Sequence, residues 1–271
     1  MTETSAVDAE RLRATLGEEA SFALEEVEVF AELDSTNRFL IEHPPREDRA
    51  LRVCIAEFQT RGRGRRGREW LSPRSAGLCL SVSWRFAAEP ADLATITLAA
   101  GVAVRSAVET SCGVAPALKW PNDLMLDGRK LGGILVELAA TRRAARHVVV
   151  GVGLNVAVPS ETLANFSDWP AGAIDLHSAL GRTPDRTELG ARLCLALGKV
   201  FVDYESIGFG AYCDAWRRAD YLRDAAIVVQ RGAEELRGSA RGIDDDGALL
   251  VTDTSGCEHR IVSGDVSVRL T

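Results

Sequence analysis

The sequence predicts an α+β fold followed by a small C-terminal β-barrel. Helix-like and strand-like runs are interspersed up to about residue 222, and beyond it only short strand-like runs occur, divided by turn clusters. The length supports the same division, because 271 residues with 46% hydrophobic and 26% charged residues are enough for a large domain and a small one. We therefore predict a first domain at 1–222 and a second at 223–271.

The first part of the chain carries clear periodic signals. In order, we predict a helix at 7–16, a strand at 25–33, a strand-to-helix corner at 35–37, strands at 51–58 and 76–86, and a helix at 90–113. Asp92 is placed to begin the last helix and Gly113 to end it.

The middle of the chain predicts a hairpin and a second long helix. The sequence "DG" at 127–128 supplies the turn between two strand-like runs at 116–126 and 131–141. A strand at 146–150 then leads into "GVGLNV". Residues 158–185 are punctuated by Pro and Gly and are expected to be rich in loops, and a helix follows at about 186–205.

The last fifty residues have the pattern of a small barrel. Their strand-like runs are "AAIVVQ", "LRGSARGI", "GALLVT", "EHRIV" and "VSVRL", and their turn clusters are "RGAEE", "DDDG", "TSG" and "SGD". Short strands at such close spacing are typical of small all-β domains.

Composition excludes several classes of protein. The longest apolar run, at 94–104, is far shorter than the roughly 20 residues of a membrane helix, so no membrane association is expected. The six cysteines are scattered and do not cluster with the four histidines, so a zinc site lacks ligands and the thiols are expected to be buried and reduced. We predict a cytoplasmic protein.

Residues 61–68 hold five arginines and three glycines, although the formal net charge of the chain is −7. Gly62, Gly64 and Gly67 match a dinucleotide-binding pattern, but that pattern requires a helix directly after it, and here "WLSP" and a strand follow. An RNA-binding module is a second interpretation, although no other basic cluster of this density supports it.

A loop that closes over a small anion is the third interpretation of this segment, and we favour it over a merely solvated run of charge. Glycine permits close backbone approach and positive φ, and guanidinium groups match carboxylates and phosphates. Two further segments could complete such a site. "KWPNDL" holds Lys119, Asn122 and Asp123 around a proline, and Lys130 precedes the Gly132-Gly133 pair, which leaves room for a ligand against a strand.

Five motifs in this order resemble the biotin protein ligases: "DSTN", "EFQTRGRGRRGREW", "KWPNDL", "GRKLGGILVE" and "GVGLNV". The resemblance implies a mixed-sheet catalytic domain of the biotin/lipoate ligase type with helices packed on it, and a small C-terminal SH3-like β-barrel. About 25 residues precede the first predicted strand, which are too few for a winged helix-turn-helix domain, so we expect no DNA binding.

The resemblance also implies roles for individual residues. Biotin-binding positions would be Ser35, Thr36, Asn37, Gln59, Gly62, Arg63, Gly64, Arg65, Lys130, Gly132, Gly133 and Gly153. Nucleotide-binding positions would be Arg65, Arg66, Arg68, Trp70, Asn122, Lys130 and Asn155. Catalytic positions would be Lys130, Arg65 and Asp123, with proton acceptance and a structural role both open for Asp123. Metal ligands are not predicted.

The implied reaction has two steps, in which biotin and ATP form biotinyl-5′-AMP and a lysine of a biotin carboxyl carrier protein domain then takes the biotin. Two anions must meet in the first step, so catalysis should depend on neutralisation of charge by Arg63, Arg65, Lys130 and a magnesium ion. A lipoate or octanoate ligase is the enzymatic alternative, since it also activates a carboxylate. A homodimer is compatible with the sequence.

Overall fold

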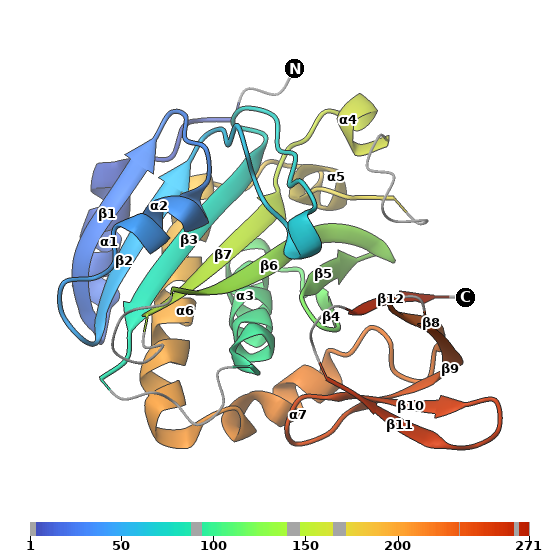
Figure 1. Cartoon of the computed structure of the whole chain (residues 1–271). Coiled ribbons are helices and arrows are strands. Elements are labelled where there is room, and N and C mark those ends of the chain that lie inside the picture. Colours follow the sequence, from blue (N-terminus) through green and yellow to red (C-terminus); the bar gives the residue numbers. More distant parts are fainter. Residues whose placement is uncertain are drawn as a thin grey trace.

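A seven-stranded mixed sheet organises the first part of the computed structural model, which describes residues 4–87, 94–139, 147–164, 172–232, 234–262 and 266–270. The strand order is β1-β2-β3-β7-β6-β5-β4 (Figure 1). Only β1 and β2 run parallel, and the other neighbours are antiparallel. The strands are β1 (Ala23–Phe30), β2 (Ala50–Ala56), β3 (Gly77–Arg85), β4 (Ala117–Lys119), β5 (Asp123–Leu126), β6 (Arg129–Ala139) and β7 (His147–Asn155).

Helices cover both faces of this sheet. The long helices α1 (Ala9–Glu19), α3 (Ile96–Cys112) and α6 (Arg186–Ile207) lie together on one face, and the short helix α2 (Thr36–Glu42) lies on the other (Figure 1). Local sequence fixes where α1 and α6 begin, because the side chains of Asp8 and Asp185 accept hydrogen bonds from backbone N–H groups of their first turns.

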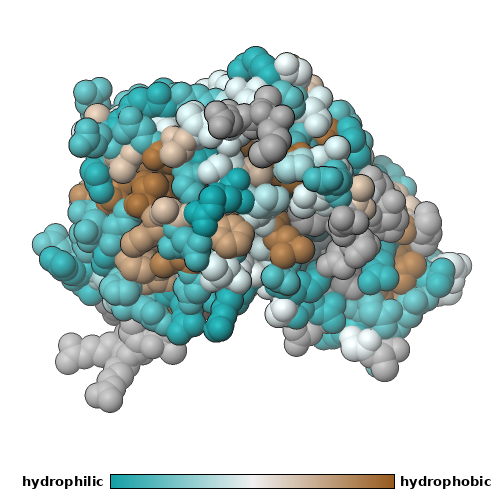
Figure 2. Space-filling model, turned by 90° about the horizontal axis from the view of Figure 1, so that it is seen from above, coloured by the Kyte–Doolittle hydropathy of each residue, from teal (hydrophilic) through white to brown (hydrophobic). Residues whose placement is uncertain are grey.

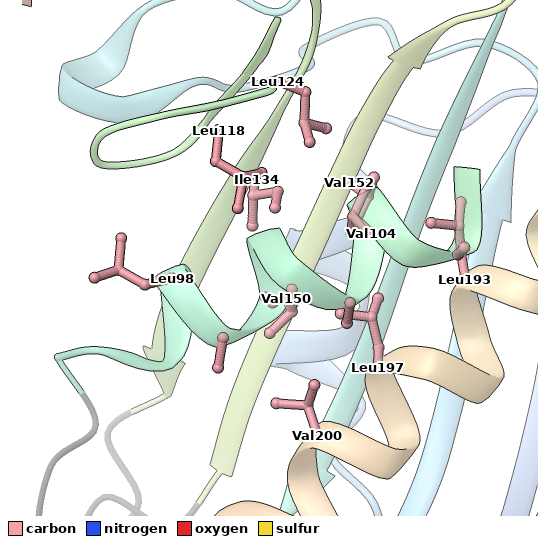
Figure 3. Packing of buried hydrophobic residues seen from close by; sticks show 14 of the residues in the cluster. Leu98, Val104, Leu118, Leu124, Ile134, Val150, Val152, Leu193, Leu197 and Val200 are labelled. Carbon is pink, nitrogen blue, oxygen red and sulfur yellow. The ribbon is translucent and has the colours of Figure 1, made fainter. Parts of the chain in front are cut away.

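The main core lies between the sheet and the three long helices. Figure 3 shows Val104 of α3 beside Val152 of β7, with Leu197 of α6 facing α3. Each fully buried aliphatic side chain of this kind stabilises the fold by about 1.5–3 kcal/mol. A smaller cluster of Leu40, Cys54 and Val149 lies beneath α2 on the opposite face. Both faces of the central strands are therefore buried, so the sheet is a rigid support for α2 and the residues around it.

The C-terminal part is a five-stranded antiparallel sheet, consistent with the predicted small SH3-like domain. Its order is β11-β10-β9-β8-β12, and its strands are β8 (Ala226–Arg231), β9 (Glu234–Ile243), β10 (Leu249–Asp253), β11 (Glu258–Ile261) and β12 (Val266–Leu270). The indole N–H of Trp120 donates to the Gly247 carbonyl at 3.0 Å, and Ile227 and Leu249 belong to the main core cluster. The boundary at 222/223 stays a prediction.

Several local predictions are confirmed and others need correction. Asp127 and Gly128 have φ values of 49° and 72°, as the predicted "DG" turn requires. Gly113 ends α3 in the left-handed conformation, but α3 begins at Ile96, and the predicted start at Asp92 lies outside the described residues. Strand β7 runs without interruption through "GVGLN", and two short helices, α4 (Ser160–Ala164) and α5 (Leu176–Leu180), occur within the segment that was expected to be rich in loops. Helix α7 (Gly210–Arg218) was not predicted.

The surface is predominantly polar. Viewed from above, hydrophilic residues cover most of the molecule, and apolar residues emerge in separate groups between them (Figure 2). Among the described helices, none combines the length and apolar character needed to cross a membrane. Five of the six cysteines are buried and Cys257 is exposed, so the prediction of buried thiols holds for all but one.

Candidate functional site

A cavity of about 570 Å³ lies on the α2 face of the sheet, between α2, the segment that joins β2 to β3, and the β5–β6 hairpin. It is lined by every predicted site residue except Gly62, Gly132 and Asn155. Five motifs that are far apart in the sequence therefore meet around one space. A cavity of this size can hold much of a drug-sized ligand.

One corner of the cavity is a hydrogen-bonded cluster at the start of α2. The Gln59 side-chain oxygen accepts from the Thr36 backbone N–H at 2.8 Å and lies 3.1 Å from the Thr36 hydroxyl. The Ser81 hydroxyl lies 2.7 Å from Thr36 Oγ1 and donates to the side-chain oxygen Oδ1 of Asn37 at 2.6 Å. Ser35 caps the helix through its side chain. These contacts fix hydroxyl and amide groups that could recognise a neutral, planar polar ligand.

Two glycines of β7 keep this region open. A Cβ on Gly151 would lie 2.1 Å from Asn37 Oδ1, and one on Gly153 would lie 2.4 Å from the Trp70 ring. Both residues line the cavity. Their missing side chains are what allow Asn37 and Trp70 to lie directly on the sheet, so the repeated glycine of "GVGLNV" has a structural reason.

The arginine segment is a compact loop rather than the start of a helix. Its only helical part is a single 3-10 turn at Arg65–Gly67, and β3 follows, which confirms that the dinucleotide pattern lacks its helix. Gly67 has φ of 72°, whereas Gly62 is needed for close approach, because a Cβ there would lie 2.4 Å from the Trp70 carbonyl oxygen. The Trp70 N–H donates to the Gly62 carbonyl at 2.9 Å.

Two loop arginines already contact the cavity walls. The Arg63 guanidinium lies 3.2 Å from Glu137 Oε1, and Glu137 Oε2 accepts a 2.8 Å hydrogen bond from the Asn37 amide. Arg65 donates to Asn122 Oδ1 at 3.3 Å, and the Asn122 amide donates to the Ile134 carbonyl at 2.8 Å. The loop is thereby connected to both the polar corner and the β5–β6 hairpin.

Two lysines flank a partly buried carboxylate at the other end of the cavity. Lys130 Nζ lies 2.6 Å from Asp123 Oδ1, and Lys119 Nζ lies 3.8 Å from Asp123 Oδ2. Burial alone would raise the pKa of Asp123, but the two ammonium groups outweigh burial and hold that pKa below its usual value. Burial lowers the pKa of Lys119 to about 8. Lys130 Nζ also lies 5.9 Å from the centre of the Trp70 ring.

The three predicted site residues that do not line the cavity support its walls. Gly62 packs against Trp70, and a Cβ on Gly132 would lie 2.4 Å from the Gly153 carbonyl oxygen. The Asn155 amide donates to the Ile174 carbonyl at 3.1 Å and to the Lys130 carbonyl at 3.4 Å. Asn155 therefore positions the backbone of Lys130, and its predicted contact with a nucleotide stays a prediction.

Several cavity residues were not among the predicted site residues. Lys119 stands in a motif that sequence analysis singled out, so its presence in "KWPNDL" was an available signal. Val268 and Arg269 reach the cavity from β12, more than 110 residues after the last of the five motifs, and no local pattern marks them. Among the described residues, no group of three or more His, Cys, Asp or Glu side chains is placed to hold a metal ion.

The class of protein follows from family models that match the two sheets separately. The model of the Biotin/lipoate A/B protein ligase family matches residues 29–155, which hold the first four motifs, all but the last residue of the fifth, and most of the large sheet. The model of the Biotin protein ligase C terminal domain matches residues 226–269, which form the five-stranded sheet.

Individual relatives narrow this class. The chain is 37% identical over 245 residues to the bifunctional ligase/repressor BirA of Salmonella typhimurium, covering 90% of this chain and 74% of that protein. It is 34% identical over 272 residues to the biotin--[acetyl-CoA-carboxylase] ligase of Mycobacterium tuberculosis, covering 96% and 98%. The structure of the biotin protein ligase of Aquifex aeolicus in complex with biotin and ATP matches with a TM-score of 0.74 at 25% identity, covering 92% of this chain and 99% of that one. The chain belongs to the biotin protein ligase family.

Proposed function

We propose that this protein joins biotin to ATP to form biotinyl-5′-AMP and then transfers the biotin to a lysine of a biotin carboxyl carrier protein domain. The observation that carries the proposal is the convergence of Arg63, Arg65 and Lys130 with a polar corner around one cavity. Two relatives support it, since one is a biotin--[acetyl-CoA-carboxylase] ligase and the structure of another holds biotin and ATP.

The first step needs the positive charge that the cavity supplies. A carboxylate oxygen of biotin attacks the α-phosphate of ATP and pyrophosphate leaves, so two anions must approach within bonding distance. Lys119, Lys130, Arg269 and four arginines of the loop line the same space, the four being Arg63, Arg65, Arg66 and Arg68, whereas its acidic residues are Asp123 and Glu69. Cationic side chains held in place before the reaction lower its barrier without reorganising during it.

The polar corner and Trp70 suit the two ends of biotin. The ureido ring is neutral and polar, and the cluster of Thr36, Asn37 and Gln59 offers fixed amide and hydroxyl groups. We assign the biotin- and nucleotide-binding roles expected from the sequence to the same residues here, with Trp70 beside the adenylate. These assignments give the carboxylate of biotin a position near Lys130.

Asp123 is better suited to hold the lysines than to accept a proton. Its carboxylate faces both Lys119 and Lys130, and a lowered pKa makes it a weak base. In the second step the acceptor amine attacks the mixed anhydride, AMP leaves and the amine loses a proton. We propose that Asp123 serves this step indirectly, by keeping Lys130 directed into the cavity.

The residues present are compatible with a magnesium ion carried by ATP. Both Asp123 oxygens face ammonium groups, so Glu69 is the carboxylate of the cavity wall that would approach the ion. Magnesium usually keeps several waters and binds through substrate phosphates with one or two carboxylates. When bound, it would offset the charge of the triphosphate.

Buried free thiols also fit a reducing, cytoplasmic location.

Mass measurement of an acceptor tests the proposal directly. The pure protein is incubated with biotin, Mg-ATP and an apo biotin carboxyl carrier domain, and the mass of the intact domain should rise by one biotinyl group on a single lysine. Parallel reactions contain lipoic or octanoic acid in place of biotin. Modification with these acids but not with biotin would establish the lipoate or octanoate ligase alternative, and an unmodified domain in all reactions would refute both.

A further inference from the structure

The two ends of the arginine loop are held together by a buried ion pair that lies outside the cavity. Glu57 directly follows β2, and Ser75 lies two residues before β3. The Ser75 N–H donates to the Glu57 carbonyl at 2.9 Å, and its hydroxyl donates to Glu57 Oε2 at 2.8 Å. Glu57 and Ser75 therefore form the base of the loop. Glu57 lies two residues before Gln59, and Ser75 lies five residues after Trp70.

Arg186, in the first turn of α6, binds both ends of this base. Its guanidinium forms an ion pair with Glu57 Oε2 and donates to the Gly77 carbonyl at 3.0 Å, so it joins both ends of the loop. The side chains of Arg186 and Glu57 are only 3% and 10% exposed. A charge pair at this depth is little screened by solvent, and loss of either partner leaves an uncompensated buried charge.

The N-terminal segment covers the ion pair. The Val7 N–H donates to Glu57 Oε1 at 2.7 Å, and the Asp8 N–H donates to the Thr187 hydroxyl at 3.0 Å. The Thr4 hydroxyl also contacts the Ser75 carbonyl. Residues 4–8 thus connect the loop base to α6. They precede both segments that match the family models, 29–155 and 226–269.

We propose that Glu57, Arg186 and Val7 are positioning residues for ligation, which hold the base of the arginine loop so that Gln59 and Arg63 face the cavity. The inference rests on the proposed function for its catalytic consequence. Ordering a loop of this length has a large entropic cost, and a fixed base removes part of that cost before the ligand arrives. Weakening the base should therefore weaken substrate binding more than it slows turnover at saturation.

A second buried arginine with carboxylate partners, on strand β2, provides a matched control. Arg52 lies near the opposite end of β2, its side chain is 9% exposed, and its guanidinium lies 2.9 Å from Glu28 and 3.1 Å from Glu26. Arg52→Met and Arg186→Met each remove one buried guanidinium from its carboxylate partners. Only Arg186 is attached to the base of the loop.

The experiment compares both variants with the wild type in thermal unfolding, limited trypsin digestion and biotin-dependent pyrophosphate release. We expect both variants to lower the unfolding midpoint. Only Arg186→Met should accelerate cleavage within 61–68, by at least tenfold, and raise the KM for biotin by at least tenfold while kcat changes less than threefold. Arg186→Lys, which retains the charge, should recover part of both effects.

The proposal would be overturned if Arg52→Met and Arg186→Met accelerated cleavage of the loop equally. It would also be overturned if folded Arg186→Met had the KM for biotin and the cleavage rate of the wild type. If Arg186→Met does not fold, Val7→Pro, which removes the N–H donated to Glu57 and fixes φ at that position, is compared with Val7→Ala, which shortens the side chain but keeps the N–H. Faster cleavage in the proline variant alone supports the proposal, and identical cleavage overturns it. Loop cleavage needs no substrate, so a wild-type protein that fails to ligate would refute the proposed function and leave this result intact.

Discussion

The ammonium nitrogen of Lys130 lies 2.6 Å from Oδ1 of Asp123, and Lys119 approaches the other carboxylate oxygen. The arrangement presents two cations and one anion at a single end of the cavity, so its net charge is positive. Lys130 comes from the start of β6 and Asp123 from the start of β5. The hairpin turn at 127–128 is therefore what brings these side chains together, so the arrangement depends on a local element of the fold.

Replacement of Lys130 by Ala should abolish most adenylate formation with little change in the fold. The side chain is 28% exposed and belongs to no apolar core, so its loss removes charge rather than packing. A cation that stabilises charge in the transition state contributes about 3 kcal/mol, or roughly a hundredfold in rate. Biotin-dependent pyrophosphate release measures the effect, and circular dichroism serves as the control. Activity near that of wild type would remove Lys130 from the site.

Gly153→Ala should damage the site, and Gly133→Ala should be tolerated better. The new Cβ at 153 would lie 2.4 Å from Trp70, whereas at 133 its nearest neighbour would be Asp123 Oδ1 at 3.6 Å. Both glycines line the cavity. Displacing the indole costs about 1–3 kcal/mol in such crowded sites. Isothermal titration with biotin should show weaker binding for Gly153→Ala than for Gly133→Ala, and the reverse order would contradict the assigned position of Trp70.

The elements marked by local patterns could be predicted from the sequence, and the contacts between distant elements could not. Turn chemistry predicted the hairpin at 127–128, and strand-like runs between closely spaced turn clusters predicted the five short strands of the second sheet. Arg269 is one charged residue in an ordinary strand, and only the packing of β12 beside the large sheet brings it to the cavity. The contacts of Glu137 could not be predicted either, because its partners Arg63 and Asn37 lie about 75 and 100 positions earlier in the chain.

Arg269→Ala should weaken ATP binding several-fold without unfolding the second sheet. Arg269 lines the cavity from β12 and is exposed to solvent, so its attraction for a triphosphate is real but screened. Arg237→Ala on β9 is the control, because that residue is exposed in the same sheet and pairs with Glu235 outside the cavity. The KM for ATP should rise in the first variant only, and the rise should shrink at high salt. Equal KM values in both variants would exclude a contribution from β12.

His147 should make the protein less stable as the pH falls below neutrality. The ring is 1% exposed, and burial, with a smaller contribution from Arg85, lowers its pKa from 6.5 to about 4. The unfolded chain binds the proton first, so stability is lost as the pH falls from about 6.5 towards 4, amounting to about 2 kcal/mol at pH 5. Urea unfolding at pH 7.5 and pH 5 measures the loss. His147→Gln should reduce this difference, and an unchanged difference would show that other groups cause it.

Ligand binding should protect the arginine loop from trypsin. Arg61, Arg63, Arg66 and Arg68 are exposed, and close guanidinium groups repel one another when no anion separates them. Each ordered residue of the loop costs about 1–2 kcal/mol of conformational entropy, so the free loop should open often enough to be cut first. Biotinyl-adenylate brings a phosphate that the arginines can bind and an apolar part that can pack against Trp70, and a closed loop would also keep water from the mixed anhydride.

Digestion time courses with and without biotin plus Mg-ATP, analysed by mass spectrometry, provide the measurement. The first cut should fall within 61–68 in the free protein, and both substrates together should slow it at least tenfold, because only together do they form the adenylate. Biotin alone should protect less, since it lacks the phosphate that several arginines can share. Arg74 is an internal control, because it is exposed but forms an ion pair with Glu32 outside the cavity, so cleavage after it should not respond to the substrates. Equal cleavage of the loop under all conditions would refute closure over the adenylate, and protection by RNA instead would favour a nucleic-acid-binding role for the arginines.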